Sequence, residues 1–229
     1  MTDRKEANAM TAAEQQRYIN AITTMLANPT NPYGKVVAIH SDMTHDMHGM
    51  DATGTQRFLP WHRDYLLKFE AMLQAIDPLC FVPYFDWTAG RMVPVWIRNF
   101  KPTVMVPGQG PVVVKRNASI PATKNITTIV NQPTYTQFTD LLESGPHNDV
   151  HMELGLVSGV REAMARVEVS PSDPIFWLHH GMLDKIWADW QVAHPGKNPT
   201  LTGDSAKMDP WPETATQLRS ITTLGYRYV

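Results

Sequence analysis

Eight of the nine histidines fall into two groups, and this grouping restricts what the chain can fold into more than any other feature. A single histidine on an apolar face is usually a hydrogen-bonded core residue, but here that explanation would have to hold several times in one chain. Histidine is the commonest metal ligand among side chains. The pattern therefore predicts two metal sites with three histidines each. The groups are His40, His45, His48 and His62, then His147, His151, His179 and His180.

Hydrophobic periodicity predicts a mainly α fold, with a helical core, long irregular loops and little β-structure. The first helix has a capping-box pattern at its start, because Thr11 is followed three residues later by Glu14. The helices are predicted over residues 11–27, 36–47, 60–76, from about residue 135, and 170–191. Loops are predicted at residues 28–34 and 49–57, and a mostly extended or irregular segment at 91–137.

Helical spacing separates the histidines of the second group. His147 and His151 are four residues apart, so on a helix both rings project from one face and can bind the same metal. His180 lies on the apolar stripe of its helix with Phe176 and Leu183. His179 points about 100° away from that stripe. We therefore expect His180, and not His179, to face a shared site.

Composition excludes several other classes. The formal net charge is −2 and no basic run occurs, so neither nucleic acid nor an anionic membrane is an expected partner. The single cysteine, Cys80, excludes an internal disulfide and a multi-cysteine zinc site. No apolar run reaches the length of a membrane span, and the amino terminus lacks the apolar core of a signal peptide. We expect a cytoplasmic protein, with export alongside a signal-bearing partner as the alternative.

The type of metal follows from the donor atoms. An all-imidazole site suits copper or zinc, but zinc hydrolases usually add carboxylate or cysteine ligands, and no HExxH motif is present. Met43, Met47 and Met50 lie among the first histidines. Thioether sulfur favours Cu(I), so these methionines tilt the choice towards copper, although packing is their default role.

Four segments resemble the tyrosinase family of type-3 dicopper proteins, which includes tyrosinases, catechol oxidases and molluscan-type haemocyanin domains. "FLPWHRDYLLKFE" (58–70) and "DPIFWLHHGMLDKIWADWQ" (173–191) are similar to its two copper signatures, and "LESGPHNDVHMELG" (142–155) resembles the segment that carries the first two ligands of its second copper. "GYRYV" resembles the family's closing Tyr-x-Tyr motif, against which an early arginine, here Arg4, packs. The resemblance implies a single catalytic domain over residues 1–229, built as a four-helix bundle that holds two copper ions and uses O2.

The resemblance also implies a ligand set. The second copper takes His147, His151 and His180, because only His180 fits the family's H-x-x-x-D pattern with Asp184. The first copper takes His62 and His40. Its third ligand departs from the family, because Thr53 stands where a histidine is usual. We predict that His48 substitutes, with His45 as the alternative and an incomplete first site as a further one.

The resemblance implies a function as well. In the family a glutamate and an asparagine, here Glu143 and Asn148, hold a water that deprotonates monophenols, although Glu143 could equally be a solvated charge at a helix end and Asn148 a helix cap. The expected activity is therefore that of a tyrosinase acting on a small phenolic substrate. The alternatives are a catechol or o-aminophenol oxidase and, remotely, an O2-carrier-like or copper-deficient homologue.

Two expectations concern the surroundings of the site. No shielding domain follows the Tyr-x-Tyr motif, so the pocket is expected to be open or covered by a separate small protein, such as a copper chaperone or caddie protein. Cys80 has no histidine neighbour, so no Cys–His thioether is expected. Arg63, Asp173 and Asp184 are expected to join helix ends through charge-assisted bonds.

Overall fold

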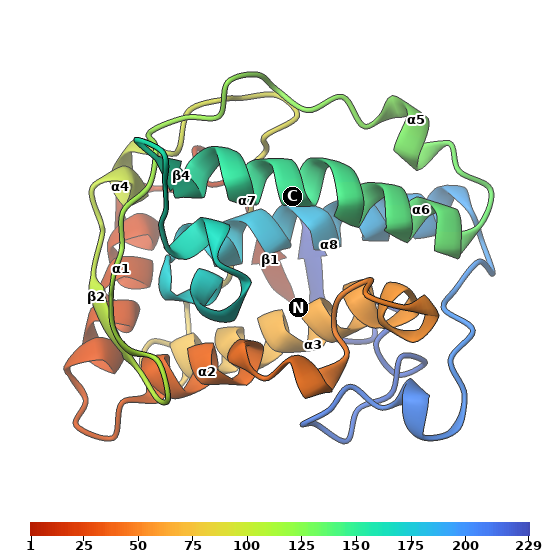
Figure 1. The fold of residues 1–229 in the computed structure, drawn as a ribbon, viewed down its shortest axis with the longest axis horizontal. Helices are drawn as coiled ribbons and strands as arrows, with labels where there is room; N and C mark the ends of the chain where they lie inside the picture. Colours follow the sequence, from red (N-terminus) through yellow and green to blue (C-terminus); the bar gives the residue numbers. More distant parts are fainter.

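Four helical segments form the centre of the molecule, as a computed structural model of residues 1–229 shows. Helices α6 and α7 run nearly in line across α8, and α2 and α3 cover the other side (Figure 1). This arrangement confirms the mainly α prediction. The helices are α1 (Ala12–Ala27), α2 (Pro32–Ser41), α3 (Ala52–Gln74), α4 (Val95–Arg98), α5 (Thr127–Val130), α6 (Tyr135–Leu142), α7 (Asn148–Gly155) and α8 (Ile175–Ala193).

Local signals place the ends of several helices. The capping box at the start of α1 is confirmed, because Thr11 accepts from the Glu14 amide and the Glu14 side chain accepts from the Thr11 amide. At the start of α8 the Asp173 carboxylate accepts from the backbone N–H of Ile175 at 3.1 Å. Both contacts satisfy amide groups that a helix leaves unpaired in its first turn.

The predicted limits of α2 and its preceding loop were wrong. Asn31 caps α2 by accepting from the Gly34 amide, and Pro32 stands in the first turn, so the helix starts inside the segment expected to be a loop. It ends at Ser41, and a short 3-10 turn, Met43–His45, follows. His45 and His48 are therefore not on α2, and their directions do not follow its helical phase.

The predicted start of α3 was also wrong. Asp51 accepts from the amides of Thr53 and Gly54, both at 2.8 Å, and α3 begins at Ala52 instead of Pro60. Proline lacks an N–H, so Pro60 removes one hydrogen bond from the helix interior. The helix continues because its buried residues, including Phe58 and Trp61, pack into the core.

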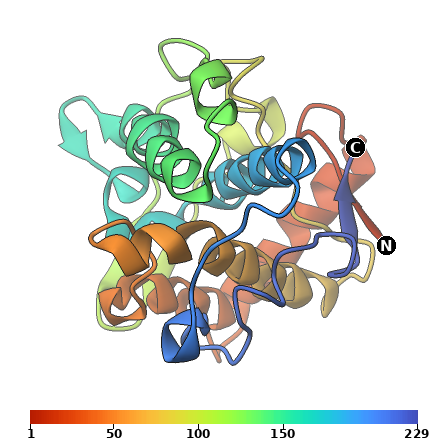
Figure 2. The same ribbon diagram turned by 90° about the vertical axis from the view of Figure 1, so that its right-hand side faces the viewer.

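The β-structure is limited to three two-stranded pairs. Figure 2 shows both chain ends side by side, where β1 (Thr2–Arg4) pairs in parallel with β6 (Tyr226–Tyr228). The antiparallel pairs are β2 (Thr103–Val106) with β3 (Gly110–Val113), and β4 (Leu156–Val157) with β5 (Val160–Arg161). Short 3-10 helices cover Ala163–Ala165, Val167–Ser172 and Gly203–Ala206. None of the helices has the length and apolar character needed to cross a bilayer.

A buried charge cluster joins the chain ends to α3 and α8. Asp184 on α8 accepts from Arg63 on α3 and from the hydroxyls of Tyr226 at 2.7 Å and Tyr228 at 2.5 Å. Arg4 stacks on the Tyr226 ring, 3.6 Å from its centre. Burial opposes ionisation of Asp184, but the charges of Arg63 and Arg4 hold the pKa of this carboxyl below its ordinary value. The expected packing of Arg4 on the Tyr-x-Tyr motif is thus present.

The other scaffold aspartate has a partner that the sequence did not indicate. Asp173 pairs with Arg116, a fully buried arginine that also donates to the Phe100 carbonyl at 2.9 Å. This contact links the start of α8 to the irregular segment before α5.

Candidate metal centre

The first histidine group converges from two helices and the loop between them. His40 lies near the end of α2, His62 lies in the middle of α3, and His48 lies in the loop that precedes α3. All three are buried and offer ring nitrogens that lie within 4.8 Å of one another. This spacing fits three ligands of one metal ion.

The second group forms where the turn before α7 meets α8. A π-helical turn, Glu143–His147, places His147 next to α7, which carries His151, and their ring centres are 4.6 Å apart. His179 and His180 approach from α8, and all four residues offer ligand atoms within 4.8 Å of one another. The distances alone therefore leave four candidates for three positions.

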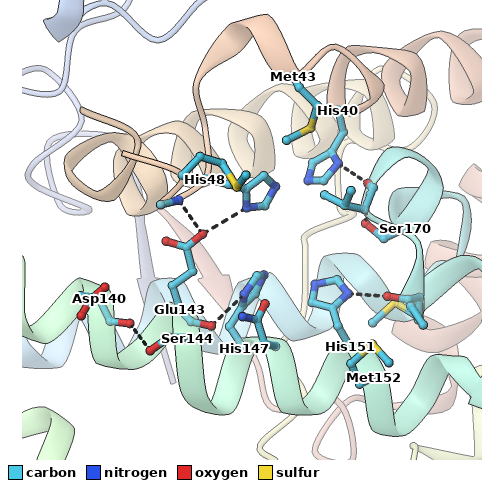
Figure 3. Close-up of a pocket in the computed structure, with 16 residues that line it drawn as sticks. His40, Met43, His48, Asp140, Glu143, Ser144, His147, His151, Met152 and Ser170 are labelled. Atoms are coloured by element: carbon cyan, nitrogen blue, oxygen red, sulfur yellow. Dashed lines mark hydrogen bonds and ion pairs between the residues drawn. The ribbon is translucent and has the colours of Figure 1, made fainter. Parts of the chain in front are cut away.

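Backbone carbonyls orient three of these rings. The Nδ1 atoms of His40, His62 and His151 lie 2.8, 2.8 and 2.7 Å from the carbonyl oxygens of Val167, Phe58 and Met164. Nδ1 must donate in such a contact, so a neutral ring carries its lone pair on Nε2. The first and last of these contacts are drawn in Figure 3.

Two pairs of Nε2 atoms lie close together in the buried centre of the site. Nε2 of His40 lies 3.4 Å from Nε2 of His62, and Nε2 of His151 lies 3.3 Å from Nε2 of His180. His48 and His147 each have a buried Nε2 without any hydrogen-bond partner. The lone pairs of His40 and His62 face each other and repel unless a cation lies between them, and the second group offers donors of the same kind, so the donor set fits two metal ions.

Burial keeps the rings in the form that metals bind. It lowers the pKa of His40, His62, His147 and His180 well below the ordinary histidine value. It lowers the pKa of His151 to about 4. The rings are therefore neutral near pH 7, and metal binding does not have to displace a proton from them.

His179 differs from the other members of its group in its tautomer. The indole N–H of Trp87 donates to Nδ1 of His179 at 3.0 Å, and burial lowers the pKa of His179 well below its ordinary value. A neutral ring that accepts at Nδ1 carries its proton on Nε2. Neither nitrogen of His179 then has a free lone pair, which supports the prediction that His180 is the ligand.

The structure places His48, and not His45, beside His40 and His62. The His48 ring centre is 5.2 Å from each of the other two. His45 instead stacks against Trp61 and lies 3.9 Å from the Asp42 carboxylate. The ligand set His40, His48, His62, His147, His151 and His180 remains a prediction.

A cavity of about 550 Å³ opens onto both histidine groups. Glu143 and Asn148 line it, and Glu143 is 9% exposed, so it is not a solvated charge at a helix end. Asn148 is exposed and its side chain makes no capping bond. Met43 and Met50 also line the cavity, whereas Met47 is buried in the core. Cys80 is a free buried thiol that belongs to neither histidine group.

Two features of the site could not be read from the sequence. Trp87 contacts His179 although 92 positions separate the two residues in the sequence, and no local pattern indicates such a contact. Asp140, which had no predicted role, also lines the cavity one helical turn before Glu143. Its spacing from Glu143 on a helix leading to His147 is the one signal that pointed to it.

Comparisons with known proteins agree with this geometry. The family model for the common central domain of tyrosinase matches residues 30–115 and 108–193. A tyrosinase of Streptomyces glaucescens is 28% identical, over 94% of each chain. Grixazone synthase of Streptomyces griseus subsp. griseus is also 28% identical, over 84% of this chain and 85% of its own. The structure of a functional unit of octopus hemocyanin is similar with a TM-score of 0.78 at 20% identity, over all of this chain and 68% of that one.

Proposed function

Because this chain belongs to the tyrosinase family and is a tyrosinase-like copper oxidoreductase, we propose that it hydroxylates monophenols as well as oxidising o-diphenols to o-quinones. Its dinuclear copper centre, which uses O2, would be held by His40, His48 and His62 and by His147, His151 and His180. When bound, the copper ions supply electrons to O2 and Lewis acidity towards a phenolate oxygen.

One observation carries the proposal of monophenol activity, namely that Glu143 and Asn148 line the same cavity as the two histidine groups. Oε1 of Glu143 accepts from the loop that carries His48, and no protein group donates to Oε2. Oε2 can therefore accept from a water that the Asn148 amide also contacts. A carboxylate in this position can take the phenolic proton through that water.

This proton transfer matters more for a monophenol than for a catechol. A phenol of pKa near 10, like tyrosine, is protonated at neutral pH and must lose its proton before its oxygen binds a metal well. A catechol has a second hydroxyl that can deliver protons during turnover. Loss of the base should therefore lower the rate of monophenol hydroxylation more than the rate of catechol oxidation.

Replacement of Asn148 by alanine tests the proposal. We expect Asn148→Ala to lower the rate on a simple monophenol at least about tenfold relative to the matching catechol, because general-base assistance is typically worth 10²- to 10⁴-fold. Both rates are measured on one preparation with known copper content. A parallel fall on both substrates would show that Asn148 supports the fold or the His147 ring instead.

The match to grixazone synthase favours a second candidate, since that relative has the same 28% identity as the tyrosinase of Streptomyces glaucescens, although over 84% instead of 94% of this chain. This candidate is an oxidase of catechols or o-aminophenols that uses the same six histidines. Rates on a monophenol, a catechol and an o-aminophenol at equal copper content separate the two. Absence of monophenol hydroxylation in the unmodified protein would favour the second.

A further inference from the structure

His48 is held differently from the other predicted ligands. His40, His62 and His151 lie on helices, and the Nδ1–H of each ring donates to a backbone carbonyl oxygen that fixes the direction of the ring. His48 lies in a loop outside any helix, so its backbone does not fix the direction of its ring. Its Nδ1 atom lies 3.3 Å from Oε1 of Glu143, a carboxylate from the other half of the chain (Figure 3).

Glu143 also fixes the backbone next to His48. The same oxygen, Oε1, accepts from the amide of Gly49 at 2.9 Å. The loop is thus held at a ring and at an adjacent peptide group by one buried carboxylate. Since Glu143 opens the turn that ends at His147, the contact joins the two histidine groups.

Two glycines make this close approach possible. A Cβ atom on Gly49 would lie 2.8 Å from Oε2 of Glu143. A Cβ atom on Gly54, in the first turn of α3, would lie 1.8 Å from the His48 carbonyl oxygen. A side chain at position 54 would push the loop away from α3, and one at position 49 would displace the carboxylate of Glu143, so the sequence around His48 is suited to this arrangement.

We propose that Glu143 is the positioning residue of His48, and that its carboxylate accepts the Nδ1–H and directs Nε2 towards His40 and His62. This Nε2 is buried and has no hydrogen-bond partner in the protein. A carboxylate behind a ligating histidine fixes its tautomer and raises its basicity, and its loss typically lowers metal affinity 10- to 100-fold. The inference rests on the proposed dicopper site but not on proton transfer by Glu143.

Variants of Glu143 in the full-length protein test the inference through copper binding. Glu143→Gln retains an oxygen that can accept from Nδ1–H and from Gly49, so we expect two copper ions per chain and less than a tenfold loss of affinity. Glu143→Ala removes the acceptor, so we expect a 10- to 100-fold weaker first site and one copper ion per chain after dialysis against a competing chelator. Asp140→Asn, which removes a carboxylate one turn earlier without touching His48, should retain both copper ions.

Of two further measurements, one does not depend on bound copper and the other does not depend on substitution of Glu143. In the metal-free protein the Gly49 amide should exchange with solvent faster in Glu143→Ala than in Glu143→Gln. Gly49→Ala, which disturbs the contact from the loop side, should also lose the first copper ion. It provides the test if Glu143→Ala does not fold.

The outcomes separate this inference from the proposed function. If Glu143→Ala and Gly49→Ala bind two copper ions as tightly as the unmodified protein, the inference is wrong, whatever happens to monophenol hydroxylation. Equal copper loss in Glu143→Gln and Glu143→Ala would also overturn it, since the contact would not explain the loss. If Glu143→Ala loses the first copper ion and Glu143→Gln keeps it, while Asn148→Ala lowers the rates on both substrates equally, the inference holds and the proposed role in deprotonation fails.

Discussion

Replacement of His180 should remove copper, whereas replacement of His179 should lower the stability of the fold and leave copper bound. The two residues are nevertheless adjacent and both buried. His180 directs Nε2 towards His151, whereas Nδ1 of His179 is occupied by the indole N–H of Trp87. We expect His180→Ala to empty the second copper site. We expect His179→Ala to retain two copper ions.

The stability cost of His179→Ala can be worked out from its contacts. The substitution leaves the Trp87 N–H buried without an acceptor, which costs about 1–3 kcal/mol. It also empties the space of a ring that is 0% exposed, and large-to-small changes in a core cost about 2–5 kcal/mol. The lower ends of the two contributions add to about 3 kcal/mol, so we expect a loss of at least about 3 kcal/mol in the free energy of unfolding of the metal-free protein.

The assay is urea unfolding of each variant with and without copper, together with metal analysis. A ligand at 100 times its Kd adds about 2.7 kcal/mol to stability. The unmodified protein and His179→Ala should gain equally from copper, while His180→Ala should lose the gain from one site. Equal copper loss in both variants would refute the argument from the tautomer of His179.

Three further predictions concern pH, the buried charges and the cavity. Burial lowers the pKa of His151 to about 4 from 6.5, so between these values the unfolded chain binds protons that the folded chain does not, and stability falls as pH falls. The metal-free protein should therefore be less stable at pH 5 than at pH 7, by about 2 kcal/mol from this residue, and equal melting temperatures would contradict the prediction. Arg4→Ala leaves Glu70 and Asp184 buried without this partner and should cost about 3–5 kcal/mol in unfolding experiments. Arg227→Ala, which removes an exposed ion pair with Asp3, should leave the free energy of unfolding nearly unchanged. Asp140 and Glu143 line the cavity and no lysine or arginine does, so a phenol with an amine should be preferred over one with a carboxylate, and Asp140→Asn should reduce the ratio of their kcat/KM values about two- to fivefold.

Sequence patterns predicted the features that depend on neighbouring residues. Thr11 and Glu14 cap α1, and the apolar stripe of α8 buries Phe176, His180 and Leu183 as its spacing indicates. The four-residue spacing of His147 and His151 correctly predicted that their rings lie together. These features follow from helical geometry, which a sequence displays directly.

Other features depend on contacts between distant segments. Pro60 was taken as the start of a helix, but the packing of α3 carries the helix through it, and Asp51 provides the cap. The choice between His45 and His48 depended on where α2 ends and on a carboxylate 95 residues further along the chain. The periodicity of either segment contains no information about the other, so such pairings appear only in the folded structure.

The parallel pairing of β1 with β6 also determines when the contacts around Asp184 can form while the chain is being synthesised. Asp184 lies one helical turn after His180, and its hydroxyl donor Tyr226 is made 42 residues later. Until residues 226–228 have been made, the carboxylate lacks both tyrosine donors and Arg4 lacks the ring on which it stacks. The helix that presents His180 therefore reaches its final support late, and copper loading of the second site is expected to follow the synthesis of this strand.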